Sequence, residues 1–148
     1  MELACGLEEM AALGCRLARD LRPGLVVHLV GDLGAGKTTL ARAILHAAGH
    51  AGEVVSPSFT LVQPYDGPEM APAILHVDLY RLQRPEELEE FGLEDALADA
   101  ALLIEWPGPG GSRVPPADLV VTISGSGDDG RRLTFSGPEG WEQRWRIA

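Results

Sequence analysis

The sequence predicts a three-layer α/β domain, in which helices cover both faces of a mixed, mostly parallel sheet that also contains antiparallel hairpins. Residues 25–30 and 101–106 are short apolar runs, typical of parallel strands buried on both faces. The first run passes through a glycine-rich turn into a helical segment, which is the order of a strand–helix unit. Two later pairs of strand-like segments are separated by turn residues, which predicts the hairpins.

Length and charge narrow the possible functions. Residues 1–148 are expected to form a single domain, because this length suits one hydrophobic core. The formal net charge is −10, with 22 acidic and 12 basic residues, so the overall field repels nucleic acid phosphates and no direct, high-affinity nucleic acid binding is expected. The one basic cluster near the C-terminus is interpreted as solvated surface arginines; it consists of Arg131, Arg132, Arg144 and Arg146.

Cysteine and histidine spacing indicates neither a disulfide framework nor a structural zinc site. Cys5 and Cys15 lack a C-x-x-C spacing, and the four histidines are scattered along the chain. The start of the chain does not resemble a signal peptide, and no apolar run approaches bilayer length. We therefore expect a cytoplasmic protein that does not associate with membranes.

The first half of the chain predicts a helix, a strand, a second helix and a hairpin. Residues 7–20 place Leu7, Met10, Leu13 and Leu17 on one helical stripe, and the strand at 25–30 follows. The second helix covers residues 38–48 and ends at Gly49. Residues 59–65 and 73–80 then predict two strands of an antiparallel hairpin, and Pro64 favours an edge position for the first of them.

The second half predicts short helices, one buried strand and a terminal hairpin. Pro85 begins an acidic helical segment that Gly92 interrupts, and residues 93–100 predict another short helix. The buried strand at 101–106 is followed by a Gly/Pro-rich loop at 107–116. Residues 118–124 and 131–136 flank the turn sequence 128–130 as a hairpin, and Trp141 and Trp145 are spaced to pack on one helical face.

The glycine turn after the first strand matches the phosphate-binding pattern G-x-x-x-x-G-K-[ST] over residues 31–38. Lys37 is the one lysine in the chain, and a flexible ammonium there can reach the β- and γ-phosphates of a nucleotide. The Thr38 hydroxyl is placed to bind Mg²⁺, and the following helix adds its positive N-terminal dipole. The predicted nucleotide-binding residues are Asp32, Leu33, Gly34, Ala35, Gly36, Lys37, Thr38 and Thr39.

Phosphoryl transfer also requires carboxylates to hold Mg²⁺ and to orient the attacking group. Asp78 and Glu105 are the candidates, because each lies near the end of an apolar strand that could run beside the strand before the glycine turn. The competing interpretations are an ion pair of Asp78 with Arg81 and a loop or helix cap for Glu105. Ser58 and Thr60 are candidate switch residues, with ordinary capping as the alternative, and His76 is interpreted as a core histidine.

Five segments together resemble the TsaE (YjeE) family of small bacterial P-loop ATPases. They are GDLGAGKTT (31–39), SPSFTLV (56–62), HVDLYRL (76–82), EELEEFGLED (86–95) and IEWP (104–107), in this order over most of the chain. The resemblance implies a P-loop ATPase that is required for threonylcarbamoyladenosine at position 37 of tRNAs reading ANN codons. It also implies that the protein binds and hydrolyses ATP while docked on a TsaB–TsaD heterodimer.

The resemblance assigns roles residue by residue. Lys37, Thr39 and the loop amides would hold the phosphates. Thr38 and Asp78 would bind Mg²⁺, and Glu105 would support the metal or activate water. Ser58 stands where the family usually has threonine, and Gly108 stands where an acid is frequent.

Three other functions compete with this reading. A small-molecule or nucleoside kinase needs a lid and an acceptor pocket, for which the chain has little length left. A regulatory GTPase needs an Asn-Lys-x-Asp element, and the chain contains no asparagine. A degenerate P-loop used only as a scaffold is disfavoured by the presence of Lys37, Thr38, Asp78 and Glu105.

Overall fold

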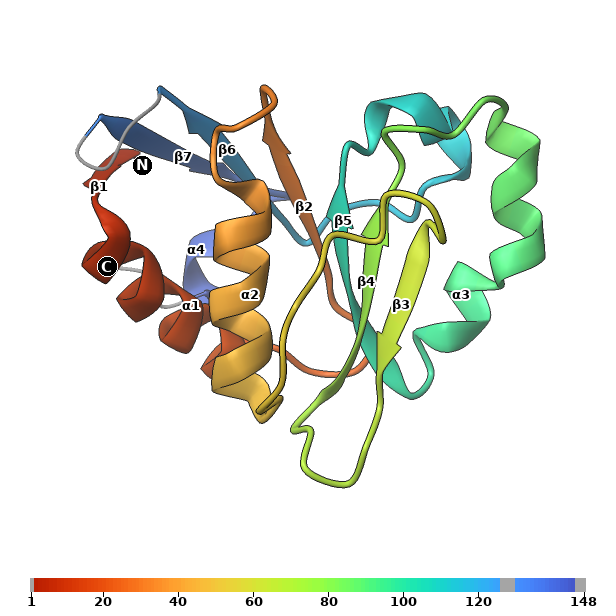
Figure 1. The fold of residues 1–148 in the computed structure, drawn as a ribbon, viewed down its shortest axis with the longest axis horizontal. Helices are drawn as coiled ribbons and strands as arrows, with labels where there is room; N and C mark the ends of the chain where they lie inside the picture. Colours follow the sequence, from red (N-terminus) through yellow and green to blue (C-terminus); the bar gives the residue numbers. More distant parts are fainter. Residues whose placement is uncertain (1, 126–129, 146–148) are drawn as a thin grey trace.

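A seven-stranded mixed sheet forms the centre of the protein in the computed structural model, which describes residues 2–125 and 130–145 (Figure 1). The strands are β1 (Glu2–Cys5), β2 (Val26–Gly31), β3 (Val62–Tyr65), β4 (Ala73–Asp78), β5 (Ala100–Glu105), β6 (Leu119–Ser124) and β7 (Arg131–Ser136). Their order is β1-β7-β6-β2-β5-β4-β3. The four central strands β6, β2, β5 and β4 are parallel, and β1, β7 and β3 add antiparallel edges. The prediction of a mixed sheet with a parallel core is confirmed.

Helices cover both faces of the sheet. α1 (Leu7–Asp20) and α2 (Lys37–Ala48) pack on one face, and the other face is covered by α3 (Leu93–Ala96) and the 3₁₀ helices η1 (Pro85–Phe91) and η2 (Gly108–Arg113) (Figure 1). The last helix, α4 (Trp141–Arg144), brings Trp145 into the core on the α1 and α2 side, and Trp141 packs beside it. These layers confirm the three-layer architecture.

The apolar pattern explains this arrangement. All six residues of β5 are buried, as expected for a parallel strand with helices on both faces. Along it, Ala101 and Leu103 belong to the core under α1 and α2, whereas Leu102 and Ile104 belong to the core on the opposite face. On α1, Met10, Leu13 and Leu17 are buried as the helical stripe predicts, and the side chain of Leu7 lies outside the described residues.

The hairpins also have the predicted pairing. β3 pairs with β4 and lies at the sheet edge, where Pro64 costs no ladder hydrogen bond to a further strand. β6 pairs with β7, although residues 128 and 129 of the predicted turn lie outside the described residues. Strand β1 was not predicted, because its four residues carry no clear pattern and are ordered by pairing with the distant β7.

Several predicted boundaries are wrong for local reasons. β3 begins at Val62 instead of residue 59, because Leu61 adopts a left-handed backbone with φ 66° and donates its N–H to the carbonyl of Pro57. β4 ends at Asp78, whose carboxylate accepts the N–H of Tyr80 and turns the chain. The segment from Pro85 forms a 3₁₀ helix, and α3 ends at Ala96, four residues before its predicted end, because β5 already begins at Ala100.

The close crossing of α1 and α2 depends on Gly14. A Cβ atom added to Gly14 would lie 2.5 Å from Cβ of Ala43 and 2.8 Å from the Ala43 backbone carbon. Overpacking of this kind costs about 1–3 kcal/mol, whereas alanine gains only about 1 kcal/mol over glycine in helix propensity. We expect Gly14→Ala to lower the free energy of unfolding by about 1–2 kcal/mol, measured by urea denaturation.

Gly108→Ala is the matched control for this prediction. A Cβ atom at Gly108 would meet nothing within 4 Å, and its φ does not lie in the left-handed region. We expect this variant to stay within about 0.5 kcal/mol of the wild type. Equal stability of the two variants would contradict the role assigned to Gly14.

The parallel arrangement determines where chemistry can occur. Because β6, β2, β5 and β4 run in the same direction, their carboxyl ends meet at one edge of the sheet, where open α/β sheets bind ligands. Within the described ranges 2–125 and 130–145, no helix combines the length and apolar character needed to cross a bilayer.

Candidate functional site

The turn between β2 and α2 lies at the carboxyl edge of the sheet. It spans the segment from Gly31, the last residue of β2, to Lys37, the first residue of α2. Gly31 has a φ of 157°, and a Cβ atom there would lie 2.4 Å from the carbonyl oxygen of Ile123 on β6. Gly36 has a φ of 114°, which a residue with a side chain rarely adopts. Glycine at these two positions therefore lets the loop close against β6 and enter the N-terminus of α2.

Lys37 is buried inside this loop. Its Nζ atom donates to the carbonyl oxygens of Gly31 at 2.5 Å and Asp32 at 2.8 Å. Burial lowers the pKa of the Lys37 ammonium, and the negative charges of Glu105, Asp78 and Asp32 oppose that shift. The only lysine of the chain is thus held at the position from which it can reach a phosphate chain.

An aromatic pair lies beside this ammonium. Nζ of Lys37 is 4.3 Å from the ring centroid of Trp106, and the Trp106 and Tyr80 rings are 4.8 Å apart. Trp106 has a left-handed backbone with φ 55°, a strained conformation for a residue with a side chain. The sequence alone indicates no role for Trp106, although it directly follows Glu105.

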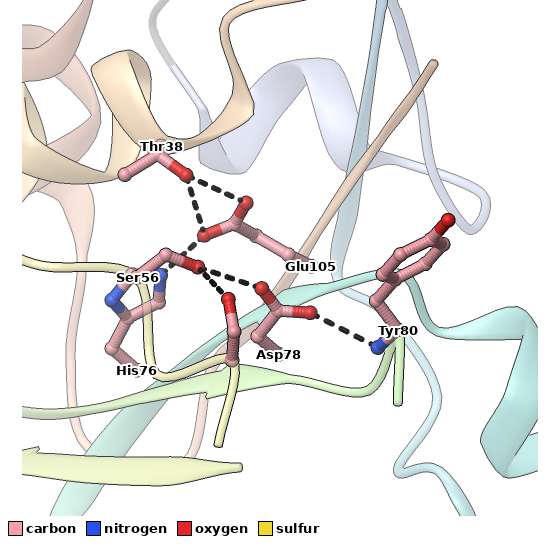
Figure 2. A network of polar contacts seen from close by, with 7 residues as sticks. Thr38, Ser56, His76, Asp78, Tyr80 and Glu105 are labelled. Carbon is pink, nitrogen blue, oxygen red and sulfur yellow. Dashed lines mark hydrogen bonds and ion pairs between the residues drawn. The ribbon is translucent and has the colours of Figure 1, made fainter. Parts of the chain in front are cut away.

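The site is connected by two short chains of polar contacts, which Figure 2 shows. In the first, Glu105 at the end of β5 accepts the Thr38 hydroxyl at 3.1 Å and contacts Nε2 of His76 at 2.5 Å. Glu105 is on the same face of β5 as Ala101 and Leu103, which pack against the α1 and α2 side, so its carboxylate reaches the first turn of α2. His76 is fully buried, as expected for a core histidine, but its partner is a candidate catalytic carboxylate.

The second chain is centred on Asp78 at the end of β4. Its carboxylate accepts the Ser56 hydroxyl at 2.7 Å and the backbone N–H of Tyr80 at 3.0 Å, and Ser56 in turn lies 3.3 Å from Oγ of Ser58 (Figure 2). Asp78 and Glu105 are paired in register on neighbouring parallel strands, so the two carboxylates lie side by side. Sequence reasoning had not singled out Ser56, whose alternating hydroxyl spacing with Ser58 was the available signal.

These groups surround one open cavity of about 260 Å³. Its lining is Leu33, Gly34, Gly36, Lys37, Thr38, Thr39, Ser56, Ser58, Asp78, Tyr80, Glu105, Trp106 and Arg131. Three other residues predicted from sequence do not line it: Ala35 is buried beneath the loop, Asp32 contributes backbone contacts to the loop, and Thr60 is exposed in the turn before β3. The structure therefore brings Ser58 but not Thr60 to the cavity. The functional roles of all these residues stay predictions.

The C-terminal basic cluster behaves differently from its sequence interpretation. Arg132 and Arg144 are exposed, and they pair with Glu2 and Asp118, as solvated surface arginines do. The interpretation is wrong for Arg131, because this half-buried residue lines the cavity beside Gly36. Arg146 lies outside the described residues.

The donor set is compatible with Mg²⁺ bound together with phosphate oxygens. Mg²⁺ prefers oxygen ligands, and it commonly uses one or two carboxylates, waters and substrate phosphates in place of an all-protein cage. The Thr38 hydroxyl donates its proton to Glu105, which leaves oxygen lone pairs for a cation. Among the described residues, no group of three or more His, Cys, Asp or Glu side chains is placed to hold a metal.

Strand β2, the glycine turn and α2, together with carboxylates from two neighbouring parallel strands, define the class of P-loop α/β proteins. The model of the family described as threonylcarbamoyl adenosine biosynthesis protein TsaE matches residues 5–133. The chain belongs to this TsaE family.

Curated relatives support the family membership. The protein named tRNA threonylcarbamoyladenosine biosynthesis protein TsaE from Haemophilus influenzae is 47% identical over 110 residues, which are 74% of this chain and 68% of the relative. The protein of the same name from Streptomyces coelicolor is 35% identical over 145 residues, covering 94% and 95% of the two chains. A third, from Rickettsia felis, is 46% identical, and the match covers 67% of this chain and 57% of that relative.

The fold is similar to a solved structure. The crystal structure of Bacillus subtilis YdiB superposes with a TM-score of 0.78 and 28% identity, covering 97% of this chain and 90% of that chain. The predicted family resemblance and the predicted fold class are therefore both confirmed.

Proposed function

We propose that this protein is a Mg²⁺-dependent ATPase that acts in the formation of threonylcarbamoyladenosine at position 37 of tRNAs reading ANN codons. In this proposal it works in the cytoplasm as an accessory to TsaB and TsaD, and it does not itself touch the modified base. The observation that supports it most is the placement of Lys37, Thr38, Asp78 and Glu105 around one cavity, in a chain that belongs to the TsaE family.

Each of these residues has a chemical task in the proposal. The loop amides and Lys37 hold the β- and γ-phosphates, and the Thr38 hydroxyl supplies a ligand for Mg²⁺. Bound Mg²⁺ would neutralise developing charge on the transferred phosphoryl group. Asp78 supports the metal, and Ser56 and the Tyr80 N–H hold its carboxylate in place.

Glu105 is the residue that the proposal assigns to metal or water activation. Hydrogen bonds from Thr38 and His76 restrict both of its oxygens to one orientation. Such fixed orientation is what efficient positioning of an attacking water requires, because little reorganisation is then needed during the reaction.

The surface around the cavity supports docking on a protein partner. Four large apolar side chains are strongly exposed there, Leu33 and Tyr80 in the lining and Val55 and Phe59 next to the lining residues Ser56 and Ser58. Phe59 is 84% exposed, which costs solvation free energy unless another surface covers it. A partner at this position would contact the nucleotide loop directly, so occupancy of the site could change the affinity of the complex.

The decisive experiment is a pull-down with purified TsaB and TsaD, with and without ATP and Mg²⁺. We expect the protein to be retained by the TsaB–TsaD heterodimer when ATP and Mg²⁺ are present. Hydrolysis of ATP without any added small-molecule acceptor would separate this function from a kinase, and a preference for ATP over GTP in a competition assay would separate it from a GTPase. No association under either condition would contradict the proposal.

A further inference from the structure

We infer that Arg131 is a phosphate-binding residue of the nucleotide site, contributed by the last strand of the sheet. This inference rests on the proposed function, because it assigns an additional contact to the same bound nucleotide. It concerns a residue outside the glycine loop and outside the two strands that carry the carboxylates.

Topology explains how a residue so late in the chain reaches the loop. β6 runs parallel to β2, so Ile123 near the end of β6 pairs with Gly31 at the start of the loop. β7 returns antiparallel to β6 and therefore begins at the same carboxyl edge. Arg131 is its first residue and alternates with Leu133 and Phe135, whose side chains pack in the core under α1 and α2. The alternation places the Arg131 side chain on the α2 side of the sheet.

The contact with the loop is close. From the position of a Cβ atom on Gly36, Nε of Arg131 lies at 3.2 Å, and Cδ and Cζ lie at 3.4 Å. Gly36 caps the N-terminus of α2, directly before Lys37 and Thr38. The guanidinium therefore lies over the point where the helix presents its free amides.

The guanidinium has polar atoms without a protein partner. Nε and Nη1 of Arg131 are buried and donate to no hydrogen-bond acceptor among the described residues. Buried donors without partners are costly, and a cation at the positive end of a helix dipole is placed unfavourably. Both costs disappear when an anion occupies the cavity, because a phosphate oxygen can accept from the planar guanidinium fork.

The ligand chemistry follows from the neighbours of the guanidinium. A phosphate chain that lies on the loop amides between Lys37 and Arg131 would meet a positive charge on each side. The carboxylates of Asp78 and Glu105 would then be available to the metal. Arg131 would then neutralise charge on the phosphate chain, as Lys37 does, but from the opposite wall of the loop.

The test compares Arg131→Met with Arg132→Met. Methionine keeps an unbranched apolar stem and removes the charge, and Arg132 is the adjacent residue of the same strand, 66% exposed and paired with Glu2. Titration calorimetry with ATP and with ADP, each with Mg²⁺, measures affinity. Loss of a charge-assisted hydrogen bond predicts roughly 10-fold to 100-fold weaker binding for Arg131→Met, and unchanged binding for Arg132→Met. Arg131→Lys should lie between Arg131→Met and the wild type.

The melting temperature, measured with and without nucleotide, separates phosphate binding by Arg131 from a purely structural role of this residue. Without nucleotide, we expect Arg131→Met to melt at or above the wild-type temperature, because it removes two buried donor nitrogens that have no acceptor among the described residues. At concentrations of ATP and Mg²⁺ that saturate the wild-type protein, the ligand-induced rise in the melting temperature of Arg131→Met should be smaller than that of Arg132→Met.

The outcomes separate this inference from the proposed function. Wild-type ATP affinity in folded Arg131→Met would overturn the role of Arg131 while leaving the ATPase proposal in place. Equal weakening in Arg131→Met and Arg132→Met would also overturn it, since a general charge effect would then explain the loss. Failure of the wild type to bind ATP would overturn both.

Discussion

Replacement of Lys37 by alanine should lower ATP affinity by on the order of 100-fold or more, to the point of abolishing detectable binding. The ammonium is held inside the loop by the carbonyl oxygens of Gly31 and Asp32, and its removal leaves the phosphates without their central counter-charge. Quenching of intrinsic tryptophan fluorescence is a direct measurement, because the Trp106 ring lies 4.3 Å from Nζ of Lys37.

The matched control for Lys37→Ala is Arg42→Ala. Arg42 is an exposed cation on the same helix that does not line the cavity, so this variant makes the same change in net charge. It should bind ATP as the wild type does. If Lys37→Ala retained wild-type affinity for ATP, the assignment of the loop as the phosphate site would be wrong.

Replacement of Glu105 by alanine should separate binding from turnover. The phosphates contact the loop and Lys37, so ATP affinity should be close to that of the wild type, whereas the rate of hydrolysis should fall by roughly 10²–10³-fold because a positioned carboxylate is lost. Glu105→Gln removes the charge and keeps the shape, with one carbonyl oxygen left to accept a hydrogen bond from Thr38 or from His76.

Single-turnover hydrolysis with enzyme in excess is the suitable measurement for the Glu105 variants, in parallel with ATP binding. Glu94→Gln is a control in which an acidic residue in the first turn of α3 is neutralised on the opposite face of the sheet. Wild-type hydrolysis by both Glu105→Ala and Glu105→Gln would refute the proposed role of this carboxylate.

The fold class was predictable because local patterns and long-range packing agree at the centre of the chain. The apolar runs of β2 and β5 and the glycine pattern between β2 and α2 are strong local signals, and the structure places them as predicted. Strand β1 carries no such signal, because it is ordered by pairing with the distant β7 and by packing of Leu3 on the core. The start of β3 was misplaced because the left-handed backbone of Leu61 is set by its turn and not by its residue type.

The candidate site was predictable to the extent that its residues belong to short motifs. Asp78 and Glu105 could be selected because both follow apolar runs, and the parallel register then brings them together. The contact of His76 with Glu105 could not be predicted, because it depends on the register of two strands that are far apart in sequence. Arg131 was missed for the same reason, since in the sequence it looks like a surface residue next to Arg132.

The order of strands in the sheet also has a consequence for how the chain folds. The residues that line the cavity come from the segment after β2, from Ser56, from the ends of β4 and β5 and from the start of β7. Strand β2 itself pairs with β5 and β6, which belong to the second half of the chain. Contacts of such large sequence separation give a high contact order and slow folding. A growing chain on the ribosome thus gains the full set of nucleotide contacts only after Arg131 has been synthesised and β7 has joined the sheet.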